Sequence, residues 1–259
     1  MTAQPIITYK KERIGYIELN RPEKRNALNA EMVAALKEAI GNFEWDKEVK
    51  VMVIKAAGKA FCSGADLAYL QSLQTNTFEE NLADSQSLKD LFYSIYTSPK
   101  IIIAQIQGHA LAGGCGLATV CDFSFAVPEA KFGYTEVKIG FIPAIVKVFL
   151  LRKIGEGKAK ELLLDGDLIS AVEAQAMGLV NWLVSADQLE ERVYEYAQKL
   201  IRQNSEQSMA LTKEMIGRVQ EKTLEEGLQY AAAMNAKARG TADCQKGIAA
   251  FLNKETINW

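Results

Sequence analysis

The stretch from Lys100 to Asp122, KIIIAQIQGHALAGGCGLATVCD, decides how this chain folds. Its first part, residues 101–106, is almost entirely apolar and predicts a short buried strand. Glycines follow at positions 108, 113, 114 and 116, where an apolar helix is expected to begin. Such a turn exposes backbone N–H groups at the start of a helix, and these can hold a phosphate, a carboxylate or the oxyanion of a reaction.

Two nucleotide-binding loops fit this glycine pattern poorly. A dinucleotide fingerprint needs G-x-G-x-x-G, and residues 114–119, GCGLAT, lack the last glycine. A mononucleotide P-loop needs a lysine directly after its glycines, and none follows until Lys131. A purely structural junction, with strand and helix packed through small residues, is the remaining alternative.

The composition narrows the class of protein. The 259 residues include 30 Lys and Arg against 32 Asp and Glu, for a net charge of −2, and the basic residues are spread along the chain. We therefore expect no nucleic-acid surface. No apolar run reaches membrane-spanning length and the N-terminus has no signal or transit pattern, so a cytoplasmic location is expected. Four cysteines without a CxxC pair, beside one histidine, argue against structural zinc and for reduced thiols.

A unit of strand, small-residue turn and helix recurs near Val51, Ile101 and Phe123, which predicts a stacked, spiral arrangement. The expected strands are residues 14–19, 49–54, 101–106 and 123–127. An N-cap at Asn29 predicts a helix whose apolar face carries Met32, Leu36, Ile40 and Phe43.

The other segments complete this organisation. The polar segment 76–85 is expected to be exposed and mobile, ahead of a helix with Leu88, Leu91, Phe92 and Ile95 on one face. Capping boxes at 170–173 and 223–226 predict helix starts, and the chain is helical in pattern from Asp187 onward. We therefore expect a core at 1–190 and an all-helical region at 191–259.

Two distant segments, around Ala65 and around Gly113, each offer backbone donors beside small residues. If the fold brings them together, they form a two-donor oxyanion hole, which stabilises negative charge on a carbonyl oxygen and acidifies the neighbouring carbon. Glu136 is the carboxylate best placed to move a proton there, and burial would raise its pKa toward the working pH. The alternative is that Glu136 is a solvated charge on an edge strand.

These residues resemble the enoyl-CoA hydratase/isomerase (crotonase) superfamily. The resemblance rests on GHALAGGC at 108–115 with Cys121-Asp122, on FCSGADL at 61–67, on Asn20-Arg21-Pro22, on Phe132-Gly133 with Glu136, and on LISA at 168–171 with Ala174, Gly178, Leu179 and Val180. It runs over nearly the whole chain in the expected order. It implies an α/β fold, a spiral of ββα repeats followed by a C-terminal all-helical region, assembled as homotrimers or homohexamers.

The resemblance also implies site residues. Ala65 and Gly113 would hold the thioester oxygen of an acyl-CoA substrate, so that coenzyme A is part of the substrate and no separate cofactor or metal is expected. The coenzyme A would lie along Ala27, Ser63, Gly64, Asp66 and Leu67, with Lys24 or Arg25 near its phosphates and Phe251 of a neighbouring subunit at its adenine. For Lys24 and Arg25, an ordinary solvated charge is an equally good interpretation.

One position departs from the family pattern. Hydratases of this family usually carry two glutamates, one at the position of Glu136 and one at the position of Gly116. Glycine cannot hold or deprotonate water, so Glu136 must act without that partner. It could add water across the double bond, or it could move the double bond by carrying a proton between carbons, as in the family's isomerases.

A finer resemblance favours hydration. Residues 135–146, TEVKIGFIPAIV, together with Gly116, are similar to bacterial proteins assigned as methylglutaconyl-CoA hydratases of leucine breakdown. Their substrate bears a second carboxylate, for which Lys138 or Lys147 is a candidate partner. Isomerisation is the alternative, followed by an acyl-CoA-binding protein without turnover and by a nicotinamide-dependent oxidoreductase.

Three further polar residues lie near the glycine turn. His109 could carry a proton, but a single histidine among small residues is more often packed and hydrogen-bonded. Cys115 at a helix start could be a nucleophile, but no base accompanies it, so a small packed residue is favoured. Asp122 is expected to cap or pair rather than to catalyse.

Overall fold

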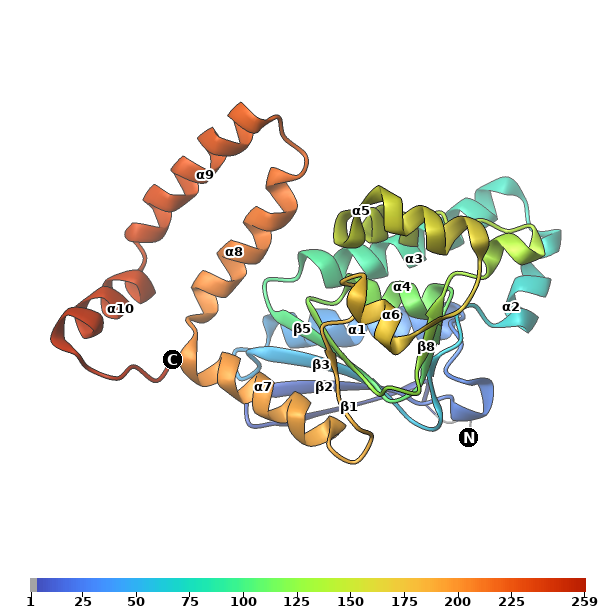
Figure 1. Cartoon of the computed structure of the whole chain (residues 1–259), viewed down its shortest axis with the longest axis horizontal. Helices are drawn as coiled ribbons and strands as arrows, with labels where there is room; N and C mark the ends of the chain where they lie inside the picture. Colours follow the sequence, from blue (N-terminus) through green and yellow to red (C-terminus); the bar gives the residue numbers. More distant parts are fainter. Residues whose placement is uncertain (1–3) are drawn as a thin grey trace.

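Two sheets form the core of the computed structural model, which describes residues 4–259 (Figure 1). The larger sheet has the order β1-β2-β3-β5-β7-β10, in which β1 is antiparallel to β2 and the other neighbours are parallel. Its strands are β1 (Ile6–Lys11), β2 (Ile14–Leu19), β3 (Val51–Ala56), β5 (Ile101–Ile106), β7 (Phe123–Ala126) and β10 (Trp182–Leu183).

The smaller sheet has the order β4-β6-β8-β9 and consists of β4 (Ala60–Cys62), β6 (His109–Leu111), β8 (Lys131–Gly133) and β9 (Ile169–Ser170). The pairs β3-β4, β5-β6 and β7-β8 each contribute their first strand to the larger sheet and their second to the smaller one. A helix follows each pair along the chain. The predicted spiral of ββα repeats is therefore confirmed.

The helices cover both faces of the larger sheet. In Figure 1, α7 lies on one side, whereas α3, α4 and α5 lie on the other. The helices are α1 (Ala30–Trp45), α2 (Leu67–Ser72), α3 (Phe78–Thr97), α4 (Gly113–Val120), α5 (Val146–Asp165), α6 (Ala171–Ala176), α7 (Leu189–Gln203), α8 (Glu206–Val219), α9 (Leu224–Arg239) and α10 (Ala242–Asn253), with short 3₁₀ turns η1 (Pro22–Lys24), η2 (Leu73–Thr75) and η3 (Glu136–Ile139). No helix in residues 4–259 is long and apolar enough to cross a membrane.

Local sequence explains where α1 and α6 begin. The Asn29 side chain accepts a hydrogen bond from the Met32 N–H at 2.9 Å, as predicted for an N-cap. The predicted apolar face of α1 is buried, and each such aliphatic side chain contributes about 1.5–3 kcal/mol to stability. The capping box of Ser170 and Glu173 starts α6, and Gly178, with φ +81°, follows its end.

The segment 76–85 is largely exposed, as predicted, but it is mostly helical. Helix α3 already begins at Phe78, because Thr77 and Glu80 form a capping box there. The first turns of α3 are polar since they lie on the surface, and only the later turns bury Leu91, Phe92 and Ile95. The predicted apolar face was right, but the helix starts about ten residues earlier than its apolar residues indicate.

Buried and partly buried lysines donate hydrogen bonds to the C-terminal ends of several core helices. Their ammonium groups donate to backbone carbonyl groups left without partners in the last turn, and a positive charge is favourable there. Lys153 donates to Thr119 and Cys121 after α4 at 3.0 and 3.1 Å, Lys50 donates to Ile201 and Asn204 after α7 at 2.6 and 2.7 Å, and Lys213 donates to Ile95 in α3 at 3.1 Å. Helix α4 is thereby fixed at the end opposite to Gly113.

The last three helices, α8 to α10, extend away from the core, and we call residues 206–253 the arm (Figure 1). Neither α8 nor α9 contains a buried residue. Several large apolar side chains of the arm are exposed instead, including Leu224, Leu228, Phe251 and Leu252. The expected boundary at 190/191 falls inside α7, which packs on the sheet, so the arm itself begins only after α7.

Candidate active site

The segments around Ala65 and Gly113 lie against each other. A Cβ atom on Gly64 would lie 3.4 Å from the backbone nitrogen of Gly113, and a Cβ on Gly113 would lie 3.9 Å from the Cα of Gly64. The juxtaposition that the sequence left open is therefore present. It joins the end of β4 to the start of α4.

Small residues make this close approach possible. A Cβ on Gly114 would lie 2.2 Å from the carbonyl oxygen of Cys62, which no side chain tolerates. Gly64 itself adopts φ +93°, a conformation that favours glycine. Only hydrogen atoms at these positions let the chain after β4 touch the first turn of α4.

The backbone N–H groups of Ala65 and Gly113 have no acceptor among the described residues. Leu28 pairs with the neighbours of Ala65: its N–H donates to Gly64 at 2.7 Å, and its carbonyl oxygen accepts from Asp66 at 2.8 Å. Gly113 is the first residue of α4, where an N–H has no partner within the helix. Both donors are therefore available to an acceptor from outside the chain.

Glu136 has a partly buried carboxyl group whose Oε2 atom is buried without a hydrogen-bond partner among the described residues. Burial raises the pKa of this carboxyl group above its ordinary value of 4.5. Glu136 does not lie in a strand, because β8 ends at Gly133 and Glu136 begins η3. The alternative of a solvated edge-strand charge is therefore wrong, because Glu136 is outside the strand and its Oε2 atom is buried.

The position of the missing second glutamate is filled. A Cβ at Gly116 would lie 2.2 Å from Cγ1 of Val146 and 3.3 Å from Cε2 of Phe92. Both neighbours are buried, so they have little room to move. This backbone arrangement cannot hold a larger side chain at position 116, and apolar atoms occupy the space instead.

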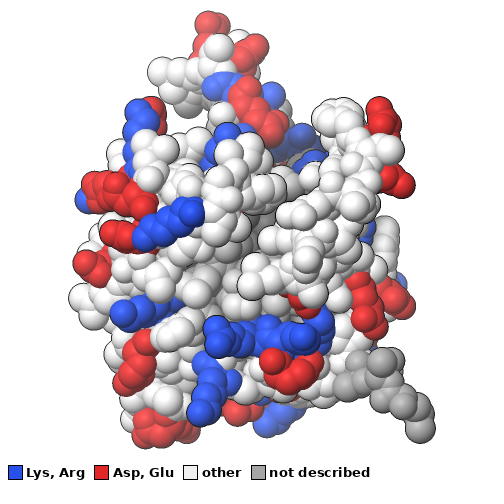
Figure 2. All heavy atoms as spheres, turned by 90° about the vertical axis from the view of Figure 1, so that its right-hand side faces the viewer, with Lys and Arg blue, Asp and Glu red and all other residues white. Residues whose placement is uncertain are grey.

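The residues expected along coenzyme A differ in their exposure. Lys24, Arg25, Ala65 and Leu67 are exposed, and Ser63 is partly buried. Ala27, Gly64 and Asp66 are buried. Figure 2 views this end of the molecule, where uncharged side chains border a hollow and Lys and Arg side chains gather beside it. Phe251 lies in α10, at the opposite end of the same chain, and is 84% exposed.

Two residues that the sequence analysis did not assign hold this region together. Arg21 forms an ion pair with Asp66 at 2.9 Å and donates to the Ala27 carbonyl oxygen at 2.9 Å. The Asn26 side chain is fully buried, accepts from the Arg21 N–H, and donates to two carbonyl groups beside β4. The turn at residues 20–22 was a visible signal for Arg21, whereas nothing in the sequence marked Asn26.

Asp66 is held by this network and also caps α2. Its Oδ1 accepts from the Ala68 and Tyr69 N–H groups at 3.0 and 3.5 Å. Burial alone would raise the pKa of Asp66, but the hydrogen bonds from Arg21, Tyr69 and Ala68 lower it below its ordinary value. The Asp66 carboxylate is therefore ionised and already bound within the chain.

The other polar residues near the glycine turn are accounted for. His109 is exposed rather than packed, and its Nδ1 accepts from the Lys131 N–H at 3.1 Å. Burial raises the pKa of the Cys115 thiol to about 11, so it is the packed residue that the sequence favoured. Asp122 pairs with Lys213 at 2.7 Å and accepts from the Ile102 N–H at 2.7 Å, as expected.

The two candidate cations for a second substrate carboxylate differ. Lys138 forms an ion pair with Asp167, and both side chains are exposed. Lys147 is exposed in the first turn of α5 and forms no ion pair with the described residues. Of the two lysines, Lys147 is therefore the one whose charge is not already paired within the described residues.

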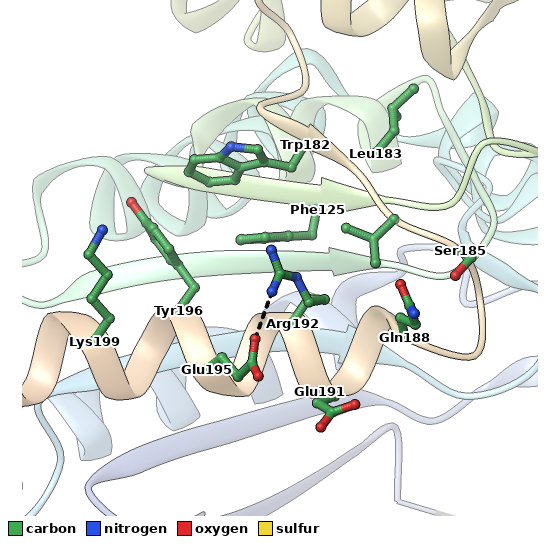
Figure 3. Close-up of a pocket in the computed structure, with 11 residues that line it drawn as sticks. Phe125, Trp182, Leu183, Ser185, Gln188, Glu191, Arg192, Glu195, Tyr196 and Lys199 are labelled. Atoms are coloured by element: carbon green, nitrogen blue, oxygen red, sulfur yellow. Dashed lines mark hydrogen bonds and ion pairs between the residues drawn. The ribbon is translucent and has the colours of Figure 1, made fainter.

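A cavity of about 950 Å³ lies elsewhere, between β10 and α7 (Figure 3). Trp182 stacks on Phe125 there, with ring centroids 4.6 Å apart, and Tyr196 of α7 closes the aromatic cluster. Its other lining residues include the ion pair of Arg192 and Glu195. None of the candidate site residues lines this cavity, so it is separate from the site at Gly113.

Comparison with known sequences supports the resemblance. The sequence model of the family described as enoyl-CoA hydratase/isomerase matches residues 9–259. A Thermus thermophilus protein assigned as an enoyl-CoA hydratase is 42% identical over 249 residues, which cover 96% of this chain and 98% of that protein. The crotonyl-CoA hydratase of Syntrophomonas wolfei is 33% identical over 261 residues, which cover 100% of this chain and 99% of that protein.

Solved structures agree in fold. An enoyl-CoA hydratase from Mycobacterium smegmatis superposes with a TM-score of 0.92 at 30% identity, and the match covers 98% of each chain. One from Bacillus anthracis superposes with a TM-score of 0.89 at 32% identity, again over 98% of each chain. The similarity therefore extends through the core and the arm.

Proposed function

Because the chain belongs to the enoyl-CoA hydratase/isomerase family, we propose that it is an enzyme that adds water across the C2=C3 double bond of a 2-enoyl-CoA thioester. The observation that carries the proposal is the contact between the Gly64–Ala65 and Gly113 segments, with two free N–H donors, in a chain that also holds Glu136 partly buried and unpaired. Such donors suit a carbonyl oxygen that gains negative charge.

In this proposal the thioester oxygen accepts hydrogen bonds from the Ala65 and Gly113 N–H groups. The two donors draw electron density from the double bond and make C3 electrophilic. Glu136 takes a proton from a water molecule as its oxygen bonds to C3, and the protonated Glu136 then returns a proton to C2. One water molecule is consumed, and a 3-hydroxyacyl-CoA is formed. The raised pKa of Glu136 makes it a stronger base than an ordinary glutamate.

Coenzyme A is a part of the substrate in this proposal, with no separate cofactor. It would lie along the partly buried Ser63 and the exposed Leu67, and Lys24 or Arg25 would approach its phosphates. The exposed apolar side chains of the arm favour packing against another copy of the chain, as a homotrimer or homohexamer. Phe251 of that copy would then contact the adenine.

The acyl group is a finer part of the proposal. If the substrate carries a second carboxylate, as 3-methylglutaconyl-CoA does, Lys147 is the better candidate partner because Lys138 is paired with Asp167. A panel that includes 3-methylglutaconyl-CoA and uncharged 2-enoyl-CoA thioesters ranks these substrates. A Lys147→Met variant should lose the preference for the charged substrate if Lys147 binds its carboxylate.

Isomerisation is the second candidate function, and one observation favours it. Val146 and Phe92 fill the space beside Gly116, so Glu136 is the single free carboxylate that we assign to the site. A single base can take a proton from C2 of a 3-enoyl-CoA and deliver it to C4, which moves the double bond without water.

A Glu136→Gln variant tests the role of Glu136. It should lower kcat by about 10²–10⁴-fold, the usual contribution of a positioned general base, and leave the Kd for coenzyme A unchanged. An unchanged kcat would contradict the proposal. A wild-type protein that binds coenzyme A but turns over no enoyl-CoA would instead be a binding protein.

A further inference from the structure

The segment that carries Glu136 is tied to helix α4 at both of its ends. Before Glu136, the Ala112 N–H donates to the Gly133 carbonyl oxygen at 2.7 Å, and Tyr134 Oη lies 2.9 Å from Thr119 Oγ1. After Glu136, Val146 packs onto Gly116. The same helix presents the Gly113 N–H at its first residue.

The Tyr134 contact has a defined direction. The Thr119 hydroxyl donates its one proton to the Cys115 carbonyl oxygen, at 2.8 Å, so Tyr134 is the donor to Thr119. Tyr134 is fully buried and Thr119 is 4% exposed, so water does not replace this bond. Tyr134 precedes Glu136 by two residues.

The Val146 contact depends on the absence of a side chain at position 116. Cγ1 of Val146 occupies the place next to a Gly116 Cβ, at 2.2 Å, and the Val146 Cβ would be 3.0 Å from it. Val146 is 5% exposed and begins α5 directly after the loop that follows η3. An alanine at position 116 would push α5, and with it this loop, away from α4.

We propose that the contacts Tyr134–Thr119 and Val146–Gly116 act as a clamp that fixes the position of Glu136 relative to the Gly113 N–H group. The clamp rests on the proposed function of Glu136 and Gly113. Its physical basis is that proton transfer requires the carboxylate and the bound carbonyl group to be aligned, and that a displacement of about 1 Å costs about 10²-fold in rate. Tyr134, Thr119, Val146 and Gly116 are positioning residues, since none of them needs to touch the substrate.

The first test is a double-mutant cycle on Gly116 and Val146. Gly116→Ala should lower kcat at least about tenfold, while the Kd for butyryl-CoA, which has no double bond to hydrate, changes less than about twofold. Adding Val146→Ala removes Cγ1 and leaves a 3.0 Å contact that a small shift relieves, so the double variant should regain part of the lost kcat. Val193→Ala in α7 is the matched control, because Val193 is also a buried helical valine.

The second test does not depend on how well Gly116→Ala folds. Tyr134→Phe and Thr119→Val each remove the hydroxyl contact, and both should lower kcat with the Kd for butyryl-CoA unchanged. Thr119→Ser keeps the hydroxyl group and should retain most of the wild-type kcat.

The outcomes separate the clamp from the proposed function. If the wild type turns over enoyl-CoA but these variants lose no more kcat than Val193→Ala, the clamp is wrong and the proposed function stands. The clamp is also wrong if kcat and the affinity for butyryl-CoA fall by the same factor. Absence of wild-type turnover would overturn both.

Discussion

A Cβ atom on Gly64 would lie 2.7 Å from the Cβ of Ala112 and 3.4 Å from the backbone nitrogen of Gly113. The two donor segments therefore meet at a glycine with φ +93°. Because Gly64→Ala adds both a clash and a strained backbone, we expect a loss of about 1–3 kcal/mol in the free energy of unfolding. Separation of the two donors should also lower kcat/KM for an enoyl-CoA by about 10²-fold. Urea unfolding and steady-state kinetics measure these two effects.

Gly41→Ala is the matched control for this prediction. Gly41 lies inside α1, and nothing is within 4 Å of a Cβ placed there. The substitution should stabilise the protein by up to about 1 kcal/mol, because alanine favours a helix, and leave kcat/KM unchanged. Equal losses of activity in both variants would show that the Gly64 contact has no special role.

The pH dependence of stability should differ between wild type and Glu136→Gln. Burial raises the pKa of Glu136 above 4.5 in the folded state, so the wild type loses stability as pH rises from about 4.5 through the folded-state value. Glutamine does not titrate. The variant should therefore melt at a higher temperature than the wild type near pH 7, and the gap should close below pH 4.5. A gap that is constant with pH would contradict a buried carboxyl group.

Breaking the ion pair of Arg21 and Asp66 should destabilise the turn before α2. The Arg21 side chain is 17% exposed and that of Asp66 is 11% exposed, and loss of one partner from a buried pair costs about 3–5 kcal/mol. Because both side chains are still partly exposed to water, we expect Arg21→Met to lower the free energy of unfolding by an amount at or below the lower end of that range. A double-mutant cycle with Asp66→Asn gives the coupling energy, and additive effects would mean that the two groups do not interact.

The ion pair of Arg21 and Asp66 should no longer stabilise the protein in acid. The pKa of Asp66 is lowered in the folded state, so its contribution is present at neutral pH and is lost as pH falls through that lowered value, below 3.8. The stability difference between wild type and Arg21→Met should shrink over that range, as unfolding at pH 7 and pH 3 can show.

Phe251 tests whether a second copy completes the site. Its side chain is 84% exposed at the far end of the chain, so Phe251→Ala should not change the stability of a single chain. If Phe251 stacks on the adenine of coenzyme A bound to a neighbour, the substitution should weaken coenzyme A binding by about fivefold or more. Light scattering checks that the assembly is unchanged, and an unaltered Kd would remove Phe251 from the site.

The sequence predicted those parts of the fold that depend on local patterns. The strand at 14–19, the Asn29 cap and the capping box at Ser170 were all predicted, because periodicity and caps act over a few residues. The start of α3 was missed because a polar surface helix has the same composition as a mobile loop.

The sequence predicted which residues belong to the candidate site, but it did not predict the contacts that hold them in place. The glycine-rich turns indicated where donors are exposed, and the departure at Gly116 was visible as a single letter. Val146 fills the space beside Gly116, and Asn26 and Tyr134 hold the surrounding segments. These contacts join residues at least 15 positions apart in the sequence. Such contacts follow from the packing of the spiral and leave no local signal.

The most direct test of the central claim is product analysis in heavy water, with wild type and Glu136→Gln side by side on a 2-enoyl-CoA and its 3-enoyl isomer. We predict that the wild type forms a 3-hydroxyacyl-CoA with one deuterium at C2 and that Glu136→Gln forms almost none. A shifted double bond without a hydroxyl group would contradict hydration and make the protein an isomerase. Equal hydration by both proteins would contradict the role of Glu136.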